Sequence, residues 1–431
     1  MIELLVRESL WMMNKTVEIC LPGDKSISHR CLLFASLCDG VSEFANLSPG
    51  QDVVSTGSCL SHMGVAIEYG SESVKVRGTA LQDAEVELYC GNSGTTARLI
   101  SGLIAGQGIG AKLTGDESLS SRPMARILDP LSKMGSQCKA HGEDGRMPLE
   151  FFASEKALQA MDYTLPVASA QVKSCLILAH LFANEAGSVH DPYGSRDHTE
   201  RMLAALGAPV RMRGDTIMVK PLEKPLSPFR LKVPGDPSSA AFFVAASLLT
   251  GKELILRNMS LNPTRLGFFR VLERMGAKLT VLSQQDFLGE PVGDLQVKAS
   301  ELTSFEINEE EVPSLVDEIP ILAILALKAK GVSKVRGAKE LRFKESDRID
   351  AMVKNLTACG VSIEEFQDGF ALEGGQKLEA AKIRSCHDHR IAMSFAVAGL
   401  LCSGEVELDE PQWADISYPG FYKVLQESFG G

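Results

Sequence analysis

Positively charged side chains stand at the start of a predicted helix in the stretch PGDKSISHR, residues 22–30. A turn precedes Lys25 and Arg30, and an apolar run follows them, which predicts that a helix begins near Asp24 or Lys25. The N-terminus of a helix carries partial positive charge, so cations in its first two turns are electrostatically unfavourable. They become favourable where backbone N–H groups, a hydroxyl and two cations converge on a phosphate or carboxylate. A solvated helix start is the alternative interpretation of this stretch alone.

The same placement recurs along the chain. Further cations at or near predicted helix starts are Arg98, Arg122, Lys173, Arg196, Lys344, Arg348 and Arg390. Each one alone is explained by an ion pair or a solvated face, but their recurrence in both halves of the chain predicts a ligand with two or more anionic groups. Ser26, Ser169 and Gln171 add neutral donors that could hold hydroxyls or phosphate oxygens. Gly94 leaves backbone N–H groups open to close approach by a ligand.

Two carboxylates are candidates for proton transfer in such a site. Asp317 begins the predicted helix of VDEIPILA, where it would also serve as an N-cap. Glu345 lies between Lys344 and Arg348 in KESDR, where an exposed ion pair is the alternative interpretation. Neighbouring cations lower the pKa of a carboxyl and burial raises it, and the sequence leaves the net direction open.

Metal ligation is not predicted. The ten cysteines are scattered without a CxxC pair, and neither GxxxxGK[ST] nor HExxH occurs. His29, His387 and His389 have no carboxylate or cysteine at ligand spacing around them.

The elements that must position these residues form an internal repeat. PGDKSISHRCLLFASLCDG from Pro22 and PGDPSSAAFFVAASLLTG from Pro234 share Pro-Gly-Asp, a serine, an apolar run and a closing glycine. Four more segments follow this plan, and they begin at Gly91, Ser169, Val316 and His387. We expect each segment to be a helix with polar N-cap residues at its start and a glycine at its C-terminus.

A short strand is predicted after each of these helices, in SEFANL, AKLTGD, SVHDP, ELILRN, SKVRGA and EVELD. In five of the six units a second helix and two alternating strands come next. The period of roughly seventy residues predicts an α/β fold built from six copies of one unit. Three copies precede Pro234, which predicts one domain over residues 22–233 and a second over residues 1–21 plus 234–431.

The opening strand, residues 16–21, has no unit ahead of it, so we expect it to join the second domain. The two crossover strands would then act as a hinge. If the domains face each other, the first helices would converge on an interdomain cleft and focus positive potential there.

Bulk composition excludes several classes of protein. With 431 residues the chain exceeds one compact core, and a net charge of −11 without a Lys/Arg-rich block argues against a nucleic-acid partner. The longest apolar runs, residues 240–249 and 391–402, are too short to span a bilayer. The N-terminus lacks the features of signal and transit peptides, so we expect a cytoplasmic protein. Met12 or Met13 is an alternative translation start, because nothing before Asn14 joins the repeat.

Eight segments together resemble the signatures of the 5-enolpyruvylshikimate-3-phosphate (EPSP) synthase family, in order, from about Asn14 to the C-terminus. They are PGDKSISHR, GNSGTTARL, LSSRPM, ASAQVKS, SRDHTE, VDEIPILA, LRFKESDR and DHRIAMSFAVAGL. The resemblance implies two domains, each of three βαβαββ units. It also implies a step of the shikimate pathway towards chorismate: transfer of the enolpyruvyl group of phosphoenolpyruvate to the 5-hydroxyl of shikimate 3-phosphate. This addition and elimination releases phosphate and needs neither metal nor cofactor.

Residue roles follow from the same resemblance. Shikimate 3-phosphate would be held by Lys25, Ser26, Arg30, Ser169, Gln171, Arg196 and Lys344. Phosphoenolpyruvate would be held by Lys25, Gly94, Arg122, Arg348 and Arg390. Asp317 would take the proton from the 5-hydroxyl, Glu345 would carry the proton at the methylene carbon, and Lys25 would share the catalytic work. Domain closure would exclude water, and a monomer suffices because both domains lie in one chain.

The sequence departs from the commonest family pattern at Ala170, Glu340 and Ile416, so the usual contacts at these points are not expected. Many members have Ser, Asn and Lys there. Gly94, in contrast, is the residue of members that are sensitive to glyphosate. We therefore expect glyphosate to inhibit in competition with phosphoenolpyruvate.

Two alternatives stay open at this point. UDP-N-acetylglucosamine enolpyruvyl transferases share the fold, but typically have a cysteine where residues 91–122 have none, and Lys-Asn where this chain has Lys25 and Ser26. A non-catalytic protein of similar fold that binds RNA ends is disfavoured by the negative charge and by the lack of base-stacking aromatic residues near the cations.

Overall fold

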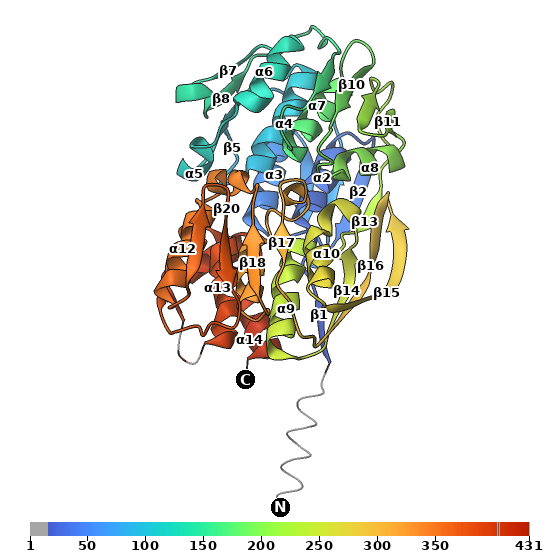
Figure 1. The fold of residues 1–431 in the computed structure, drawn as a ribbon. Coiled ribbons are helices and arrows are strands. Elements are labelled where there is room, and N and C mark those ends of the chain that lie inside the picture. Colours follow the sequence, from blue (N-terminus) through green and yellow to red (C-terminus); the bar gives the residue numbers. More distant parts are fainter. Residues whose placement is uncertain (1–15, 403, 405, 431) are drawn as a thin grey trace, which may run out of the picture. The chain divides into compact units, whose positions relative to one another are not determined.

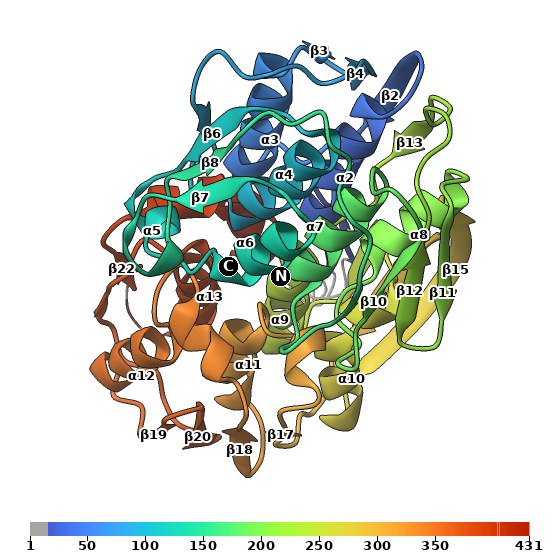
Figure 2. The same cartoon turned by 90° about the horizontal axis from the view of Figure 1, so that it is seen from above.

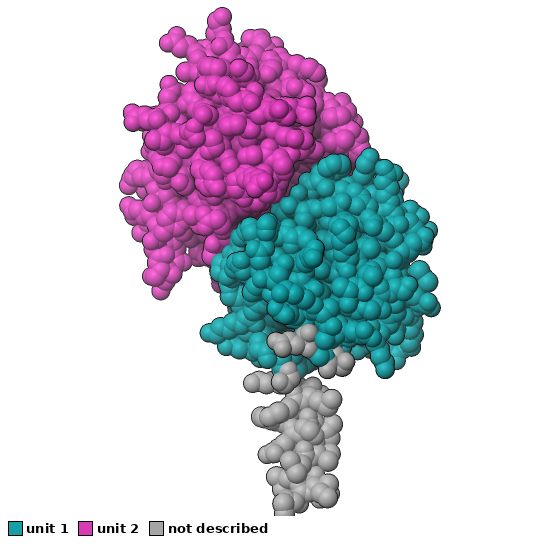
Figure 3. Space-filling model, turned by 90° about the vertical axis from the view of Figure 1, so that its left-hand side faces the viewer, with its two compact units in different colours: residues 1–22, 234–285, 291–431 teal, residues 23–233, 286–290 magenta. Residues whose placement is uncertain are grey.

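The computed structural model describes residues 16–402, 404 and 406–430 (Figure 1). The alternative start at Met12 or Met13 lies outside these residues. The chain divides into two compact units, which Figure 3 colours separately. Unit 1 consists of residues 1–22, 234–285 and 291–431, and unit 2 consists of residues 23–233 and 286–290. Within the described part of the chain, no helix is long and apolar enough to cross a membrane.

Unit 2 contains three copies of one α/β motif, in which a first helix, a strand, a second helix and a strand pair follow one another. The first helices are α2 (Lys25–Ser36), α4 (Gly94–Gln107) and α7 (Ala170–His180). The second helices are α3 (Gln51–His62), α6 (Ala125–Lys133) and α8 (His198–Ala205), and the short α5 (Glu117–Ser120) precedes α6. Figure 2 shows α2, α3, α4 and α7 grouped together, with the strands of the unit around them.

Each motif of unit 2 has a four-stranded sheet of the same order, in which an edge strand runs parallel to its neighbour and the other pairs are antiparallel. The first sheet is β13 (Arg230–Lys232), β2 (Val41–Ala45), β4 (Ser73–Arg77) and β3 (Ala66–Tyr69). The second is β5 (Leu88–Tyr89), β6 (Ala111–Thr114), β8 (Leu149–Phe151) and β7 (Cys138–Ala140). The third is β9 (Asp162–Thr164), β10 (Gly187–His190), β12 (Thr216–Val219) and β11 (Val210–Arg213).

Unit 1 repeats the plan. Its first helices are α9 (Pro237–Thr250), α11 (Ile319–Ala326) and α13 (His389–Ala398), and its second helices are α10 (Gly267–Arg274), α12 (Arg348–Ala358) and α14 (Phe421–Phe429). One sheet is β1 (Val17–Cys20), β14 (Leu254–Ser260), β16 (Glu290–Lys298) and β15 (Lys278–Phe287). The next is β17 (Glu306–Ile307), β18 (Val332–Val335), β20 (Gly369–Glu373) and β19 (Ile363–Phe366), and β21 (Lys382–Ile383) pairs with β22 (Glu407–Leu408).

The two halves of the sequence exchange an edge strand. β1 precedes α2 in sequence but pairs in parallel with β14, so that Ile19 lies opposite Leu256. β13 precedes α9 but pairs in parallel with β2, so that Leu231 lies opposite Phe44. The opening strand therefore belongs to the sheet of the second half of the chain, in the way that the sequence indicates.

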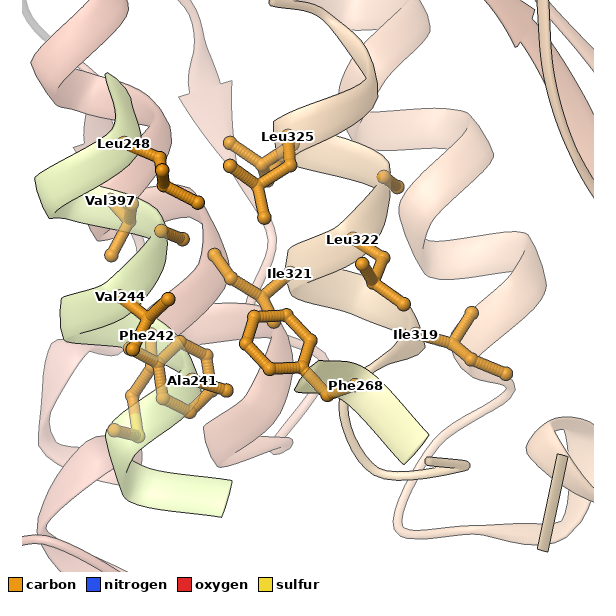
Figure 4. Packing of buried hydrophobic residues seen from close by; sticks show 14 of the residues in the cluster. Ala241, Phe242, Val244, Leu248, Phe268, Ile319, Ile321, Leu322, Leu325 and Val397 are labelled. Carbon is orange, nitrogen blue, oxygen red and sulfur yellow. The ribbon is translucent and has the colours of Figure 1, made fainter. Parts of the chain in front are cut away.

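The core of unit 1 is built around α9, whose residues are buried on every face up to Leu249. Such a helix has no polar face to present to water and lies at the centre of its layer. Figure 4 shows Phe242, Val244 and Leu248 of this helix among buried side chains that include Ile321 of α11. Each buried side chain of this size contributes about 1.5–3 kcal/mol to stability.

The predicted glycine C-caps are confirmed at one helix only. Helix α9 ends with Gly251 in the left-handed conformation, and α4 ends with Gly108 rather than Gly106. The other four first helices end several residues before the expected glycine. After α2, for example, the backbone of Asp39 and Leu37 pairs with Leu226, so a neighbouring segment satisfies groups that a glycine cap would otherwise serve.

The second helix of the last unit, α14, was absent from the sequence-based prediction. Gly420 starts it in the left-handed conformation, and Phe421 lies in the core against Phe242 and Phe243 at ring-centroid distances of 5.7 and 5.5 Å. The second helices of the other five units were predicted from a glycine that follows each helix.

Candidate active site

The starts of four helices in unit 2 are joined by one chain of hydrogen bonds. Lys25, the first residue of α2, donates to Asp52 Oδ2 near the start of α3 at 3.0 Å. The Asp52 carbonyl accepts from Thr96 Oγ1 at 3.1 Å, and Gln171 Nε2 of α7 donates to Thr95 Oγ1 at 3.0 Å. Both threonines lie in the first turn of α4. The positive ends of these helices therefore lie together at one end of the unit, where their fields add.

Short polar side chains cap three of these four helices, and α3 begins after Gly50 without a side-chain cap. Asp24 accepts from the Ile27 N–H at 2.8 Å, which confirms that α2 begins at Lys25. Ser169 caps α7 by accepting from the Val172 N–H at 3.4 Å. Its hydroxyl still has its own O–H to donate, so this cap is compatible with the predicted ligand contact.

Two guanidinium groups flank Gly94. A Cβ built on this glycine would lie 2.9 Å from Arg98 Nη1 and 3.4 Å from Arg122 Nη1. Arg122 is held by Asn92 Oδ1 at 2.6 Å, and Arg98 donates to the side-chain oxygen of Gln171. The structure thus places Gly94, Arg122 and Gln171 of the predicted site side by side, and it adds Arg98 as the link between them.

Arg30 forms a second cationic centre of unit 2. The side chain is buried, and it donates to Thr199 Oγ1 at 2.8 Å, Ser174 Oγ at 2.9 Å and the Ser26 carbonyl at 2.8 Å. The pKa of Arg30 is lowered to about 10, chiefly by burial and also by Arg196, while neighbouring carboxylates oppose both effects. Arg30 is therefore charged at neutral pH, and Arg196 lies close enough to influence its charge.

Lys173 does not belong to this group of ligand-facing cations, so its place in the predicted series was wrong. Its side chain is 2% exposed, and the ammonium is paired with Asp191 at 2.9 Å and Glu200 at 2.8 Å. A position in the first turn of a helix did not distinguish a ligand-facing cation from a buried one.

His29 is a buried neutral residue. Burial lowers its pKa to about 3, and Nδ1 lies 2.7 Å from Thr56 Oγ1. Among the described residues no group of three or more His, Cys, Asp or Glu side chains is arranged to hold a metal ion.

In unit 1 the candidate site is organised around Arg348, the first residue of α12. Its guanidinium donates to Asp388 Oδ2 at 2.8 Å, to Asp317 Oδ1 at 3.2 Å and to Glu345 Oε2 at 2.7 Å. The side chain is 2% exposed. Burial disfavours its charge, but the three carboxylates outweigh this effect and raise the pKa of Arg348. Both predicted proton-transfer residues therefore contact one permanent cation.

Asp317 is not the N-cap that the sequence predicts. Helix α11 begins at Ile319 and Glu318 occupies the cap position, because residues 315–318 form a turn before the helix. The Asp317 carboxylate is therefore available to cations, and Lys344 Nζ lies 3.8 Å from Oδ1. Burial lowers the pKa of Lys344, Asp317 opposes this effect and Arg348 adds to it.

Asp388 was missed as a site residue. It is fully buried, it caps α13 by accepting from the Arg390 N–H at 2.8 Å, and it also accepts from Ser346 Oγ at 3.0 Å. The signal was an aspartate directly ahead of an apolar helix, in HDHR. Arg390 itself is buried, and its Nε has no hydrogen-bond partner among the described residues.

Two of the three departures from the family pattern lie at an end of an element, and the third lies within a 3₁₀ helix. Ala170 is the first residue of α7. Glu340 lies in the 3₁₀ helix Lys339–Phe343, and Ile416 ends the 3₁₀ helix Pro411–Ile416.

Repeated α/β units whose helix starts carry cations, together with two carboxylates on one arginine, suit an enzyme that acts on anionic substrates. The sequence matches the family model of EPSP synthase (3-phosphoshikimate 1-carboxyvinyltransferase) over residues 13–425. The chain therefore belongs to the EPSP synthase family.

Individual relatives carry the same enzyme name as the family model. The 3-phosphoshikimate 1-carboxyvinyltransferase of Gloeobacter violaceus is 47% identical over 415 residues, which cover 95% of each chain. That of Shouchella clausii is 43% identical, with 97% of this chain and 99% of the relative covered. The EPSP synthase structure from Acinetobacter baumannii superposes with a TM-score of 0.85 at 39% identity and covers 96% of both chains.

A more distant structure shows the fold alone. The enolpyruvyl transferase NikO from Streptomyces tendae has a TM-score of 0.78 at 17% identity, with 96% of this chain and 95% of the other covered. The predicted α/β fold and enolpyruvyl transferase class are confirmed, and neither alternative function is favoured by these relatives.

Proposed function

We propose that this chain transfers the enolpyruvyl group of phosphoenolpyruvate to the 5-hydroxyl of shikimate 3-phosphate and releases inorganic phosphate. The observation that carries the proposal is the contact of Asp317 and Glu345 with the same guanidinium, that of Arg348. Two carboxylates beside a fixed cation provide proton acceptors and an anion-binding group in one place. The names of the relatives specify which anions these are.

The cations and donors of unit 2 suit the phosphate and hydroxyls of shikimate 3-phosphate. Those proposed to bind it are Lys25, Ser26, Arg30, Ser169, Gln171 and Arg196, with Lys344 from unit 1. Arg30 and Arg196 already influence each other electrostatically, and a phosphate between them would relieve the repulsion. The starts of the helices near Lys25 and Gln171 add backbone N–H donors, whose partial positive charge also favours an anion.

Phosphoenolpyruvate is proposed to bind Gly94, Arg122, Arg348 and Arg390, with Lys25. At Gly94 the absence of a side chain lets an anion approach the first turn of α4 between two guanidinium groups. Arg390 has a buried Nε–H group from which no described residue accepts a hydrogen bond. A buried donor of this kind costs free energy until a ligand accepts its hydrogen bond.

The proposed chemical steps give each carboxylate its own proton transfer. Asp317 takes the proton of the 5-hydroxyl while the hydroxyl oxygen bonds to C2 of phosphoenolpyruvate, and Glu345 delivers a proton to C3. This addition gives a tetrahedral intermediate. Glu345 then removes a proton from C3, the C2–O bond to phosphate breaks, and the enol ether forms. Asp317 gives the proton of the 5-hydroxyl to the departing phosphate or to water, so that both carboxylates return to their starting state. If the carboxylate of phosphoenolpyruvate binds Arg348, it would displace the Glu345 side chain from this guanidinium. The Glu345 carboxyl would then be available for both proton transfers at C3.

Phosphate release from the purified protein tests the function. We expect release with phosphoenolpyruvate plus shikimate 3-phosphate, and none when UDP-N-acetylglucosamine replaces shikimate 3-phosphate. Release with UDP-N-acetylglucosamine, and not with shikimate 3-phosphate, would make the chain a UDP-N-acetylglucosamine enolpyruvyl transferase. No release with either acceptor would refute the proposed reaction.

We further propose that the enzyme acts as a monomer in the cytoplasm and binds no nucleic acid. The net charge of −11 and the single-chain origin of all proposed site residues support this. Light scattering after size exclusion should give the mass of one chain, and RNA should leave phosphate release unchanged.

A further inference from the structure

A buried layer of charged groups lies beneath the loop that carries Arg196, and the residue roles above leave it without a function. Lys173 of α7 is at its centre. The ammonium donates to Asp191 Oδ2 at 2.9 Å and to the Ser195 carbonyl at 2.9 Å, and it pairs with Glu200 Oε1 at 2.8 Å. An ammonium has three N–H donors, so these three contacts use all of them and leave none for a ligand.

The contact with Ser195 connects Lys173 directly to the backbone of Arg196. The Ser195 carbonyl and the Arg196 N–H belong to one planar peptide unit, so the hydrogen bond from Lys173 sets the direction in which the Arg196 side chain leaves the loop. Asp191 holds the same loop from its other end. It accepts from the Tyr193 N–H at 3.2 Å, the Ser195 N–H at 2.9 Å and the Ser195 hydroxyl at 2.6 Å.

The neighbouring residues of the same two helices hold Arg30. Ser174 follows Lys173 in α7, and Thr199 precedes Glu200 in α8. Their hydroxyls lie 2.7 Å apart, and each accepts a hydrogen bond from the Arg30 guanidinium. One layer therefore determines the position of both cations that are proposed to meet the phosphate of shikimate 3-phosphate.

Stability alone is a poor explanation for this layer. Lys173, Asp191 and Glu200 are each at most 3% exposed, and buried ion pairs often contribute no more than apolar residues of similar volume. Burial raises the pKa of Glu200, against the effect of Lys173. For Asp191, burial acts in the same direction but Lys173 and Ser195 outweigh it, so that the pKa of Asp191 is lowered. The layer maintains charges in the interior that a purely structural core would not need.

We propose that Lys173 is a positioning residue for shikimate 3-phosphate, which fixes the peptide before Arg196 and acts with Ser174 to preorganise Arg30. The inference rests on the proposed function, in which Arg30 and Arg196 bind the phosphate of this substrate. Preorganised cations lose little freedom on binding, so loosening them weakens affinity more than it slows chemistry.

Two variants separate positioning from stability. Lys173→Met removes all three contacts and leaves two carboxylates buried without their cation. Lys173→Met with Glu200→Gln removes a positive and a negative charge together, so the layer keeps the net charge of the original protein. We expect the single variant to unfold at a lower temperature and the double variant to recover most of this loss.

The double variant should nevertheless have a KM for shikimate 3-phosphate raised about tenfold or more, because the Ser195 contact is still absent. Its kcat and its KM for phosphoenolpyruvate should change by less than about threefold, since the lost interaction concerns binding of one substrate. Lys112→Met is the matched control in the same unit. It breaks an exposed pair with Glu87, 42% and 54% exposed, and should change neither stability nor KM.

A cycle with Arg196→Gln decides whether Lys173 acts through Arg196. In the Glu200→Gln background, Lys173→Met should raise KM by a clearly smaller factor once Arg196 has been replaced, and the remaining effect is the part that acts through Arg30. Independent, multiplying effects would overturn the inference, and so would a folded double variant that binds shikimate 3-phosphate like the original enzyme in calorimetric titration. These failures leave the proposed function intact. An original enzyme that neither binds nor turns over shikimate 3-phosphate would refute both.

Discussion

At the scale of single residues, the geometry around Arg348 assigns separate tasks to groups of the same chemical type. Asp388 is fully buried and serves as a structural partner of the guanidinium, whereas Asp317 and Glu345 are 18% and 19% exposed. Only the partly exposed carboxylates can exchange a proton with a substrate. The same distinction applies to the cations, because Lys173 is used internally while Lys344 is 24% exposed.

Glu345→Gln tests the proton transfer at the methylene carbon. The amide keeps an oxygen that accepts from Arg348 but cannot carry the proton, so we expect kcat to fall by about 10²–10⁴ with KM for shikimate 3-phosphate nearly unchanged. Steady-state phosphate release measures both. Glu365→Gln, which alters an exposed partner of Arg342, is the control. A kcat within threefold of the original would remove Glu345 from the mechanism.

The lowered pKa of Lys344 predicts a pH dependence. A lowered pKa means that the ammonium loses its proton at a lower pH than an ordinary lysine as pH rises. The kcat/KM for shikimate 3-phosphate should therefore decline on the alkaline side earlier than an ordinary lysine would allow, since this ratio reports groups of the free enzyme. Lys344→Arg should move the decline to higher pH. An alkaline limb at the same pH in both proteins would contradict the assignment.

Gly94→Ala tests the space beside the two guanidinium groups. The new Cβ would lie 2.9 Å from Arg98 Nη1, so Arg98 must shift, and its link to Gln171 with it. We expect glyphosate to compete with phosphoenolpyruvate in the original enzyme, and the variant to need about tenfold more glyphosate for the same inhibition. Gly110→Ala is the control, because its Cβ would make only ordinary contacts at 3.5 Å. Original rates that stay unchanged at millimolar glyphosate and low phosphoenolpyruvate would refute the competition.

At the scale of elements, polar caps place the functional residues. Asp24 and Asp236 follow the same Pro-Gly pair, and both cap a helix with their side chains, Asp24 through the Ile27 N–H and Asp236 through the Ser238 N–H. Only α2, however, carries cations in its first two turns. The cap is therefore a feature of the repeat, whereas the cations are specific to α2 and to the proposed substrate site. At α13 the two coincide, because Asp388 both caps the helix and binds Arg348.

Replacing Asp388 separates these two contributions. Asn preserves the capping oxygen, so Asp388→Asn should lose the ion pair alone, which costs about 3–5 kcal/mol when one partner of a buried pair is removed. Asp388→Ala should lose about 1 kcal/mol more, because the N-cap is also gone. Chemical denaturation followed by fluorescence and circular dichroism measures both. Equal stability of the Asn variant and the original would mean that Arg348 finds another partner.

At the scale of the whole molecule, an acidic protein concentrates positive potential at one end of a unit. The net charge is −11, yet the starts of α2, α3, α4 and α7 lie together with Lys25, Arg98 and Arg122 nearby. Local attraction acts within a few ångströms, whereas the net charge acts over a Debye length of about 8–10 Å at physiological salt. The local field therefore governs binding once a substrate arrives.

Salt should weaken this local attraction. We expect the KM for shikimate 3-phosphate to rise several-fold between about 0.05 and 0.5 M potassium chloride, with kcat changed little, because screening reduces the field of the partly exposed cations. Sucrose at matched osmolality controls for general solvent effects. A KM that falls with salt would show that repulsion by the net charge dominates instead.

Much of this organisation could be predicted from the sequence because it depends on local chemistry. The Pro-Gly-Asp turns, the polar helix starts and the apolar runs between them predicted the repeats, and helix α2 begins where its cap requires. The helix ends were predicted poorly. Glycine signals a helix end only where no neighbouring strand takes over the free carbonyls, and after α2 the segment around Leu226 does so.

The sequence by itself determined the repeat, its elements and the residue types at each helix start, since caps, periodicity and turn residues act between neighbours in the chain. Only the tertiary structure decided which of these residues can meet a ligand. Lys173 lies in the first turn of α7 and Arg30 in the second turn of α2. Lys173 is enclosed by Asp191 and Glu200, whereas Arg30 is held by hydroxyls and a carbonyl. That difference depends on side chains brought together from distant segments, and burial and charge neutralisation are properties of such an assembly rather than of any stretch of sequence.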